Sequence, residues 1–388
     1  GIFIGGWAGF FAYELGRYIE NIPHHAKDDI PLPLVRLDFY DKIICRDNRN
    51  DCFWLFVLAF EDEKEKVGDK MTHLERLLND AQKIQTNKPQ RTKVGEDDLK
   101  GFDCNMERSD YCRALDKILK YIYEGDVYQI NFSQRFSCQF KGSGIDLYKW
   151  QNYMNPSPYA AYIDRKAYKI VSASPELFFS LVNGTITTKP IKGTRRRYNT
   201  QFDDRLDFDH KKINEQNIRE LLDCEKEKAE LNMIIDLERN DLGRICQYGS
   251  VKVTGARAIE QYPTVYHAVA TIEGRLRDGI TFCDCLMAMF PGGSITGAPK
   301  IRAMEIIDEL EPTARSVYTG SMGYIGIDGN ACLNIAIRTI IICDDIAYAQ
   351  AGGGIVADSK NEFEWEETIT KARSLLASIN TIRKENTR

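Results

Sequence analysis

The stretch LFFSLVNGTITT, residues 177–188, decides the fold class of this 388-residue chain. Both of its halves are rich in aromatic and β-branched residues, which favour strands. Asn183-Gly184 lies between the halves and is the dipeptide most typical of a two-residue hairpin turn. The stretch therefore predicts two neighbouring antiparallel strands, at 177–182 and 185–188.

Strand-like and helix-like segments follow one another in mixed order along the rest of the chain. Alternation at period two predicts a strand in VYQINFSQRF (127–136), and β-rich runs predict others at 167–171, 320–327, 333–342 and 347–351. Apolar residues at helical spacing predict helices at 109–123, 211–235, 301–309 and 363–379. No regular βαβ spacing connects these segments, so the sequence predicts an α+β fold with mostly antiparallel sheets.

The first hundred residues differ in character from the rest. Residues 61–100 are highly charged, and their polar stretch through Asp98 is predicted to be a linker or a long surface excursion. This stretch is therefore a candidate boundary between an amino-terminal region, 1–100, and the rest of the chain. Because Gly1 begins in the middle of a strand-like stretch, we expect the parent protein to have further sequence upstream.

Composition limits the class of protein. Hydrophobic residues make up 43% of the chain and charged residues 28%, and the formal net charge is −5, which disfavours a general nucleic-acid binder. The eleven cysteines are scattered without CxxC or zinc-ligand spacing, which is typical of reduced thiols in the cytoplasm. No apolar run approaches the roughly 20 residues of a membrane span, and no signal peptide is recognisable. We expect a cytoplasmic protein with neither nucleic acid nor a membrane as partner.

Two pairs of glutamates share the same spacing on different predicted helices. Glu227 and Glu230 are three residues apart, as are Glu364 and Glu367, so each pair lies on one helix face. Four carboxylates from two helices could hold one hard cation such as Mg²⁺. The alternative is that both pairs belong to solvated helix faces.

Two glycine-dense stretches, PGGSITGAPK (291–300) and AGGGIVADS (351–359), could bring backbone N–H groups close to an anion. Neither matches the P-loop or the dinucleotide fingerprint, so ATP and NAD are poorly supported, and plain tight turns are the alternative. His267 lies in an apolar segment, where a lone histidine is more often a satisfied core residue than a catalyst.

The segment KPIKGTRRR (189–197) places five basic residues around one Gly-Thr turn. Lys192 stands between Ile191 and Gly193, and a partly apolar pocket with cationic neighbours would lower its pKa and make the amine a nucleophile. A nucleic-acid contact is the alternative, although aromatic residues are not interleaved with the basic ones.

These stretches, in this order, resemble the chorismate-utilising enzyme family. Its members include anthranilate synthase component I, aminodeoxychorismate synthase component I, isochorismate synthases and salicylate synthases. The resemblance covers 104–380 and is carried by SPELFF (174–179), PIKGTRRR (190–197), AELNMIIDLERNDLGR (229–244), YPTVYHAVATIEGRL (262–276), FPGGSITGAPKIRAMEIIDELEP (290–312), GSMGYIG (320–326), NIAIRT (334–339) and AGGGIVADSKNEFEWEET (351–368). It implies two large β-sheets packed as a sandwich, with helices outside and the active site in the cleft between the sheets. The opening stretch GGWAGFFAYELGR is similar to the later part of the family's amino-terminal region.

Two positions sort the reactions within this family. Isochorismate and salicylate synthases carry a lysine base where this chain has Gln129, and an amide cannot take a proton from water. Anthranilate synthases usually carry alanine where this chain has Lys192, whereas lysine is typical of aminodeoxychorismate synthases. The resemblance thus implies conversion of chorismate and ammonia to 4-amino-4-deoxychorismate, for 4-aminobenzoate and folate synthesis. Arg196 stands where many members have proline.

The resemblance also implies roles for individual residues. Lys192 would attack C2 of chorismate and expel the C4 hydroxyl, with Glu176 as acid/base, Glu227 as general acid and His267 orienting the site. Mg²⁺ would be held by Glu230 and Glu367, with Glu227 and Glu364 beside them. The expected contacts to the substrate are Thr194, Tyr324, Arg338, Gly353, Gly354 and Lys371.

Further expectations concern partners and regulation. Ammonia would come from a separate glutamine amidotransferase subunit. Pro158, Tyr159 and Ala160 match half of a tryptophan pocket, whose other half would lie upstream of residue 1. Two alternatives remain open, an anthranilate synthase component I with an unusual lysine and a non-catalytic homologue that only senses a ligand.

Overall fold

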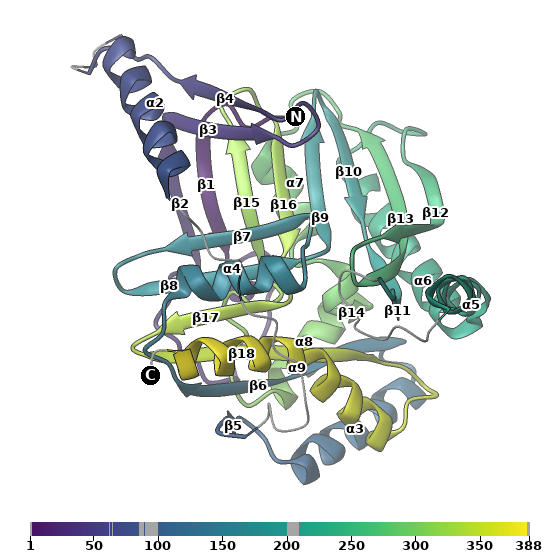
Figure 1. Ribbon diagram of the computed structural model, residues 1–388. Coiled ribbons are helices and arrows are strands. Elements are labelled where there is room, and N and C mark those ends of the chain that lie inside the picture. Colours follow the sequence, from purple (N-terminus) through teal and green to yellow (C-terminus); the bar gives the residue numbers. More distant parts are fainter. Residues whose placement is uncertain are drawn as a thin grey trace.

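The computed structural model describes residues 2–61, 63, 65–84, 89, 100–199 and 209–385. Two large sheets form the body of the molecule, and Figure 1 shows the strands of the second sheet running across those of the first. Most of the polar stretch predicted as a linker lies outside the described residues. Among the residues described, no helix is both long and apolar enough to cross a membrane.

The first sheet joins strands from both ends of the chain. Within the described residues it contains nine strands, and all their pairings are antiparallel. Its order is β11 (Ile191–Arg196), β13 (Val265–Arg275), β10 (Thr185–Lys189), β9 (Leu177–Val182), β16 (Ala331–Ile335), β15 (Ser321–Gly326), β1 (Gly6–Phe11) and β2 (Val35–Tyr40), with β12 (Lys252–Gln261) beside β13.

The second sheet is also antiparallel and contains seven strands in the described part of the chain. Its order is β14 (Gly297–Ala298), β6 (Gln129–Gln139), β18 (Ile346–Ile355), β17 (Thr339–Cys343), β8 (Tyr168–Ser174) and β7 (Tyr159–Asp164), with β5 (Asp103–Cys104) beside β6. A separate hairpin pairs β3 (Lys42–Asp47) with β4 (Cys52–Val57).

Helices cover the outer faces of the two sheets. Those against the first sheet are α5 (His210–Asp223), α6 (Glu225–Gly243) and α7 (Phe282–Met289), and those against the second are α3 (Arg108–Tyr123), α4 (Gly144–Met154), α8 (Lys300–Leu310) and α9 (Asn361–Glu385). The remaining helical segments are η1 (Tyr13–Leu15), α1 (Gly16–Ile19), α2 (Val67–Lys83), which packs on β4, and η3 (Gly293–Ile295).

Apolar packing explains this layering. One cluster lies between the sheets and combines Phe10 and Met322 of the first with Ile170 and Ile341 of the second. Each sheet also packs on its own helices through one larger cluster, so that both faces of each sheet are buried. The α+β prediction of two antiparallel sheets in a sandwich with helices outside is confirmed.

The hairpin at 177–188 is also confirmed. Leu177–Val182 and Thr185–Lys189 pair in antiparallel fashion, with Asn183 at φ +50° and Gly184 at φ +76°. Two left-handed residues in succession are what a type I′ turn requires, and asparagine and glycine adopt that conformation most readily.

Two predicted elements are wrong because each is divided in the structure. The predicted strand 333–342 is β16 followed by β17, which belong to different sheets, and the chain crosses between the sheets just before β17, with Arg338 at φ +49°. The predicted helix 211–235 is α5 followed by α6, with Cys224 extended between them. Arg257 donates to the carbonyl groups of Leu221 and Cys224 at this break, which satisfies acceptors that the helix leaves open.

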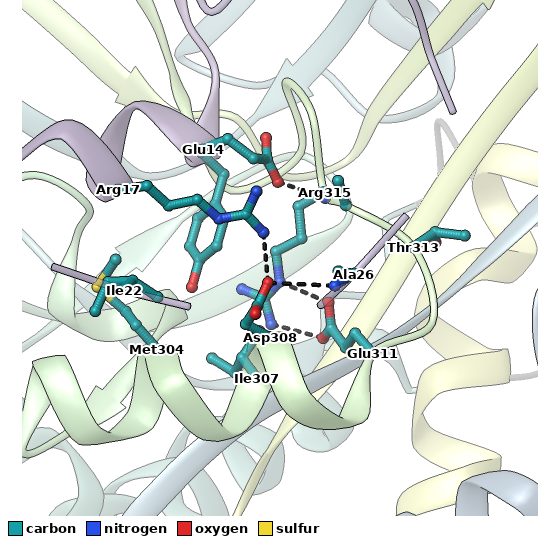
Figure 2. A pocket seen from close by; sticks show the side chains of 12 residues that line it. Glu14, Arg17, Ile22, Ala26, Met304, Ile307, Asp308, Glu311, Thr313 and Arg315 are labelled. Carbon is teal, nitrogen blue, oxygen red and sulfur yellow. Dashed lines mark hydrogen bonds and ion pairs between the residues drawn. The ribbon is translucent and has the colours of Figure 1, made fainter. Parts of the chain in front are cut away.

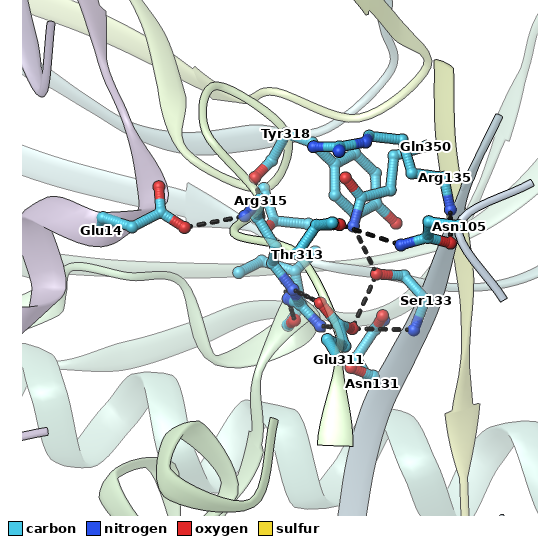
Figure 3. A network of polar contacts seen from close by, with 12 residues as sticks. Glu14, Asn105, Asn131, Ser133, Arg135, Glu311, Thr313, Arg315, Tyr318 and Gln350 are labelled. Carbon is cyan, nitrogen blue, oxygen red and sulfur yellow. Dashed lines mark hydrogen bonds and ion pairs between the residues drawn. The ribbon is translucent and has the colours of Figure 1, made fainter. Parts of the chain in front are cut away.

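The buried Arg315 connects three segments that are far apart in the sequence. Arg315 is 1% exposed and binds both carboxylate oxygens of Glu311, at 2.7 and 2.9 Å. Its guanidinium also donates to the carbonyls of Ile295 in η3 and Asn131 in β6, and Figure 3 shows this network. Because one guanidinium satisfies acceptors on three segments, the glycine-rich stretch 291–298 is held against the second sheet.

The amino-terminal segment is attached to the same network. Glu14 accepts a hydrogen bond from the Arg315 N–H at 2.8 Å, and burial raises the pKa of Glu14 to about 7. Arg17 pairs with Asp308 of α8 at 2.5 Å, in the small pocket that Figure 2 shows. These contacts fix η1 and α1 against α8.

Candidate functional site

Lys192 lies at the meeting point of the two sheets. It is the second residue of β11, is partly buried, and its Nζ donates to the carbonyl of Ser294 at 3.4 Å. A methyl group on Gly354 of β18, in the other sheet, would sit 3.6 Å from this Nζ. Burial lowers the pKa of Lys192, although Glu230 and Glu176 nearby act in the opposite direction. The amine of Lys192 therefore loses its proton more readily in this site than it would in water.

Glu176 stands beside Lys192 between β8 and β9. Its side chain is 4% exposed, and burial raises its pKa, opposed by a hydrogen bond from Ser294 and by the charge of Lys192. A buried carboxyl group with a raised pKa, next to an amine with a lowered one, is a suitable proton acceptor for that amine. Ser294 contacts both groups and was not singled out in the sequence.

The two predicted glutamate pairs face the same place from different helices. Glu227 and Glu230 lie on α6, and Glu364 and Glu367 lie on α9. Lys226 Nζ on α6 lies 4.0 Å from a carboxylate oxygen of Glu364 on α9. Burial raises the pKa of Glu230 on α6, and the negative charge of Glu367 on α9 raises it further. A methyl group on Gly353 would lie 3.4 Å from Glu364 Oε2 and 3.6 Å from Glu367 Oε1. Both pairs therefore approach β18 near Lys192, and Glu364 is 4% exposed rather than solvated.

Arg195 and Gly193 determine how Glu227 is held. Arg195 donates to Glu227 Oε1 at 2.8 Å, while Oε2 is buried without a hydrogen-bond partner among the described residues. Gly193 has φ +97°, and a methyl group there would sit 2.8 Å from that Oε2. The strand that carries Lys192 therefore passes directly against Glu227, and only glycine permits the approach.

His267 faces the same strand from β13. It stands opposite Thr194 in the register, and its Nδ1 is 2.8 Å from Thr194 Oγ1, while Nε2 is buried and unpartnered within the described chain. Burial, with Arg338 nearby, lowers the pKa of His267 to about 3. The imidazole is therefore neutral near pH 7 and suits hydrogen bonding better than proton release.

Arg338 and Lys371 are the cations available for an anionic ligand. Burial lowers the pKa of Arg338, and no carboxylate pairs with its side chain in the part of the chain described. Lys371 binds Glu367 at 2.5 Å and the carbonyl of Gly352 at 3.1 Å. Burial opposes ionisation of Glu367, but Lys371, together with Lys226 and Lys192, lowers the pKa of Glu367 overall. Side chains of Glu367 and Lys371 are 48% and 49% exposed, so the site opens to solvent on this side.

The donor set at this place is chemically suited to Mg²⁺. Four carboxylates supply hard oxygen ligands, and Glu227 Oε2 has no partner of its own. In the described residues, however, no three carboxylate, imidazole or thiol groups already surround one point, because Lys192, Lys226 and Lys371 lie among the acids. The residues fit the ion by type, and the magnesium assignment stays a prediction.

Gln129 is buried beside Lys192 with its amide unsatisfied. It is 0% exposed, and neither its Nε2 nor its Oε1 finds a partner among the described residues. A methyl group on Gly354 would lie 2.6 Å from Nε2, so the amide is directed at the same glycine as Lys192. Unpaired buried amides are rare, and a bound ligand would supply the missing partners.

The contacts described for two other predicted regions involve different neighbours. Tyr324 packs its ring on Phe3 at 4.8 Å, and burial raises its pKa to about 12, with a smaller contribution from Cys332. Tyr159 lies at the start of β7, and its carbonyl accepts a hydrogen bond from the Asn334 side chain at 2.9 Å. Burial raises the pKa of Tyr159, with a smaller contribution from Cys332. The contact of Tyr324 with the substrate stays a prediction. The tryptophan pocket at Pro158, Tyr159 and Ala160 also stays one.

Known proteins are similar to this chain in sequence and in fold. The family model for chorismate binding enzymes matches residues 2–377. The chain is 38% identical to aminodeoxychorismate synthase component 1 of Bacillus subtilis over 378 residues, which is 97% of this chain and 77% of that protein. It is also 38% identical to anthranilate synthase component 1 of Aquifex aeolicus over 386 residues, covering 97% and 74%.

A solved structure agrees with these sequence matches. The crystal structure of anthranilate synthase component I from Streptococcus pneumoniae TIGR4 superposes with a TM-score of 0.83 at 33% identity, covering 96% of this chain and 81% of that one. Relatives of both synthase types thus match the chain almost from end to end. The chain belongs to the family of chorismate-binding enzymes and is a chorismate-utilising enzyme of the anthranilate and aminodeoxychorismate synthase type.

Proposed function

We propose that this protein is an aminodeoxychorismate synthase component, which converts chorismate and ammonia to 4-amino-4-deoxychorismate through a covalent bond to Lys192. The single observation that carries the proposal is the setting of Lys192, whose amine has a lowered pKa and lies beside the buried carboxyl group of Glu176. A lysine that only paired with a substrate carboxylate would be better served by a fully protonated amine.

The reaction begins with a proton transfer from Lys192 to Glu176. The neutral amine forms a bond to C2 of chorismate, the two ring double bonds shift, and the C4 oxygen leaves as water with a proton from Glu227. Ammonia then bonds to C4, the double bonds shift back, and Lys192 leaves C2 as a neutral amine with the electron pair of its bond. The new ammonium at C4 returns a proton to Glu227, and Glu176 returns its proton to Lys192. Oε2 of Glu227, which has no partner in the described chain, is the oxygen free for this proton transfer.

Binding of the two substrate carboxylates requires positive charge and N–H groups. Arg338, which lacks a carboxylate partner in the described structure, binds one of them, and Lys371 with the backbone of Gly353 and Gly354 assists. His267, neutral and held by Thr194, orients the substrate through Nε2. These are the roles that the family resemblance implies.

Magnesium would be held by Glu230 and Glu367, with Glu227 and Glu364 beside them. When bound, Mg²⁺ supplies positive charge that neutralises a substrate carboxylate and stabilises charge on the departing oxygen. The ammonia would be delivered by a glutamine amidotransferase subunit, for the synthesis of 4-aminobenzoate and folate in the cytoplasm.

The second candidate is an anthranilate synthase component I in tryptophan synthesis. Equal identity to relatives of both types supports it as much as the first. Only Lys192 and its setting favour the aminodeoxychorismate reaction, so the product must decide.

Product analysis with chorismate, ammonium and Mg²⁺ tests the proposal. We expect a non-fluorescent product that becomes 4-aminobenzoate when a lyase is added. Fluorescent anthranilate as the main product would overturn the proposal and establish the second candidate. Conversion of Lys192→Ala to an anthranilate producer would support the proposal, because ammonia could then reach C2 directly.

A further inference from the structure

A second group of buried acids lies behind the turn that holds Glu176. Glu238 and Asp241, near the end of α6, are 3% and 4% exposed. Lys300 at the start of α8 pairs with Asp241 at 2.5 Å and donates to the carbonyl of Met289 at 2.7 Å. Glu238 Oε2 is buried with no hydrogen-bond partner among the described residues. The single cation is thus engaged by Asp241, and Glu238 lacks a partner of its own.

The turn at Gly293 and Ser294 separates Glu238 from the reactive pair. The backbone of Gly293 hydrogen-bonds Glu238, and a methyl group on Gly293 would lie 3.5 Å from Glu238 Oε1 and only 2.4 Å from Leu237. The hydroxyl of Ser294 binds Glu176, and its carbonyl accepts from Lys192. Two consecutive residues therefore contact all three groups, and close packing at Gly293 prevents the turn from moving away.

The charge on Glu238 depends on pH in the neutral to alkaline range. Burial, and next the charge of Asp241, raise the pKa of Glu238 to about 8, with Lys300 opposing and Glu176 adding to the shift. Because the interaction between two carboxylates is mutual, a charge on Glu238 raises the pKa of Glu176 in turn. Such a buried acid destabilises the fold, and groups of this kind are concentrated at functional sites.

The other elements packed against α6 direct their described charged groups to other partners. In β13, His267 hydrogen-bonds Thr194, Arg275 donates to the carbonyl of Asn183, and Glu273 lies opposite Thr187 and Lys252. Segments η3 and β14 consist of uncharged residues, and Asp284 of α7 is engaged with Thr281 in a capping box. The cations of β11 and β12 act elsewhere, with Lys192 near Glu230, Arg195 on Glu227 and Arg257 on the first turn of α6. Arg244 and Glu20 act on Asp241.

We propose that Glu238 is a positioning residue for Glu176: its carboxyl group, set behind the Gly293–Ser294 turn, adjusts how strongly Glu176 draws the proton of Lys192. When Glu238 is ionised, its charge destabilises the carboxylate of Glu176, which is one of the charges that act on Glu238. Proton transfer from the Lys192 ammonium to the Glu176 carboxylate removes that repulsion. Ionised Glu238 therefore promotes formation of the neutral amine.

This inference rests on the proposed nucleophilic role of Lys192. It predicts that replacing Glu238 by glutamine matters only where Glu238 would be ionised. Below about pH 6.5 the wild type and Glu238→Gln should react alike, because the side chain at position 238 is uncharged in both. Above about pH 8 the wild type should be faster, by roughly three- to tenfold.

The test is the pH profile of kcat/KM for chorismate, at a constant concentration of neutral ammonia, for the wild type, Glu238→Gln and Asp236→Asn. Asp236 is an exposed acid on the same helix and serves as the matched control. We expect the ratio of wild type to Glu238→Gln to rise across about pH 8, and the ratio to Asp236→Asn to stay constant. A ratio that is the same at every pH would mean a merely structural role and would overturn the inference.

Two further measurements separate the possible failures. Glu238→Asp retains a titratable carboxyl group, so its kcat/KM should rise with pH as that of the wild type does, even if Glu238→Gln folds poorly. A Glu238→Asp profile without that rise would count against the inference. Mass spectrometry of Lys192 in the wild type after long incubation with chorismate tests the proposed function by itself, because the charge of Glu238 changes the rate at which the adduct forms and not whether it forms.

Discussion

Gly193 approaches Glu227 so closely that a methyl group on its Cα would lie 2.8 Å from Glu227 Oε2. Gly193 also has φ +97°, a backbone conformation that residues other than glycine rarely adopt. One glycine therefore sets the distance between the strand that carries Lys192 and the helix that carries two of the predicted metal ligands. Both the fold and the chemistry depend on its lacking a side chain.

Gly193→Ala should consequently lose stability and activity together. The positive φ and the contacts with Glu227 and Leu221 should lower the free energy of unfolding by about 2–4 kcal/mol. Turnover of chorismate should fall further than stability explains, because Glu227 is displaced. Urea unfolding and steady-state kinetics check this, with Gly249→Ala as the control, since that glycine also has positive φ but open space around it. Equal loss of turnover in the two variants would contradict the account.

Arg338→Ala should raise the KM for chorismate by roughly ten- to a hundredfold, the worth of one charge-assisted hydrogen bond. No carboxylate in the described structure pairs with this arginine, so its removal leaves no protein charge unpaired. Steady-state kinetics measure the effect, and Arg46→Ala, in an exposed position on β3, provides the control. An unchanged KM would remove Arg338 from the site.

Glu230→Gln should abolish Mg²⁺ binding while the protein stays folded. The change removes one ligand charge and relieves a carboxylate whose pKa is already raised by burial. Isothermal titration calorimetry with Mg²⁺ alone measures the loss, and circular dichroism checks the fold. Glu366→Gln, at an exposed position on α9, should bind Mg²⁺ like the wild type. Undiminished binding to Glu230→Gln would show that the ion is held elsewhere.

His267 should make the protein sensitive to acid. Its pKa is lowered to about 3 in the folded protein, against an ordinary value of about 6.5 in the unfolded chain. The group therefore contributes fully to stability above pH 6.5, and that contribution is lost as pH falls toward 3. The loss is on the order of 4 kcal/mol.

Urea unfolding of the wild type and His267→Gln between about pH 7 and pH 4 isolates this contribution. The stability difference between the two should shrink or reverse as pH falls, because glutamine does not titrate. The exposed His24→Gln should follow the wild type throughout. Parallel curves for wild type and His267→Gln would show that His267 is not held neutral.

Sequence patterns predicted those elements whose conformation depends on a few neighbouring residues. The hairpin at 177–188 depends on Asn183 and Gly184 alone, so it could be identified from the sequence. The break before Arg338 could not, because NIAIRTIIIC contains neither glycine nor proline and reads as one strand. There the chain changes sheets, and an arginine adopts φ +49° for tertiary reasons.

The site shows the same division. Spacing suggested each glutamate pair, but the meeting of α6 with α9 near Lys192 depends on sheet packing and came only from the family resemblance. Ser294 and Glu238 were missed because neither stands out within its motif. Their importance arises from burial beside Glu176, which a sequence does not display.

The bond that we propose between Lys192 and the substrate can be detected by mass spectrometry of the protein incubated with chorismate and Mg²⁺ but without ammonia. The adduct should add the mass of chorismate less one water, on the peptide that contains Lys192. It should be absent from Lys192→Ala and present in Lys189→Ala, whose lysine pairs with Glu260 instead. Absence of any adduct from the wild type, together with full aminodeoxychorismate synthesis by Lys192→Ala, would contradict the claim.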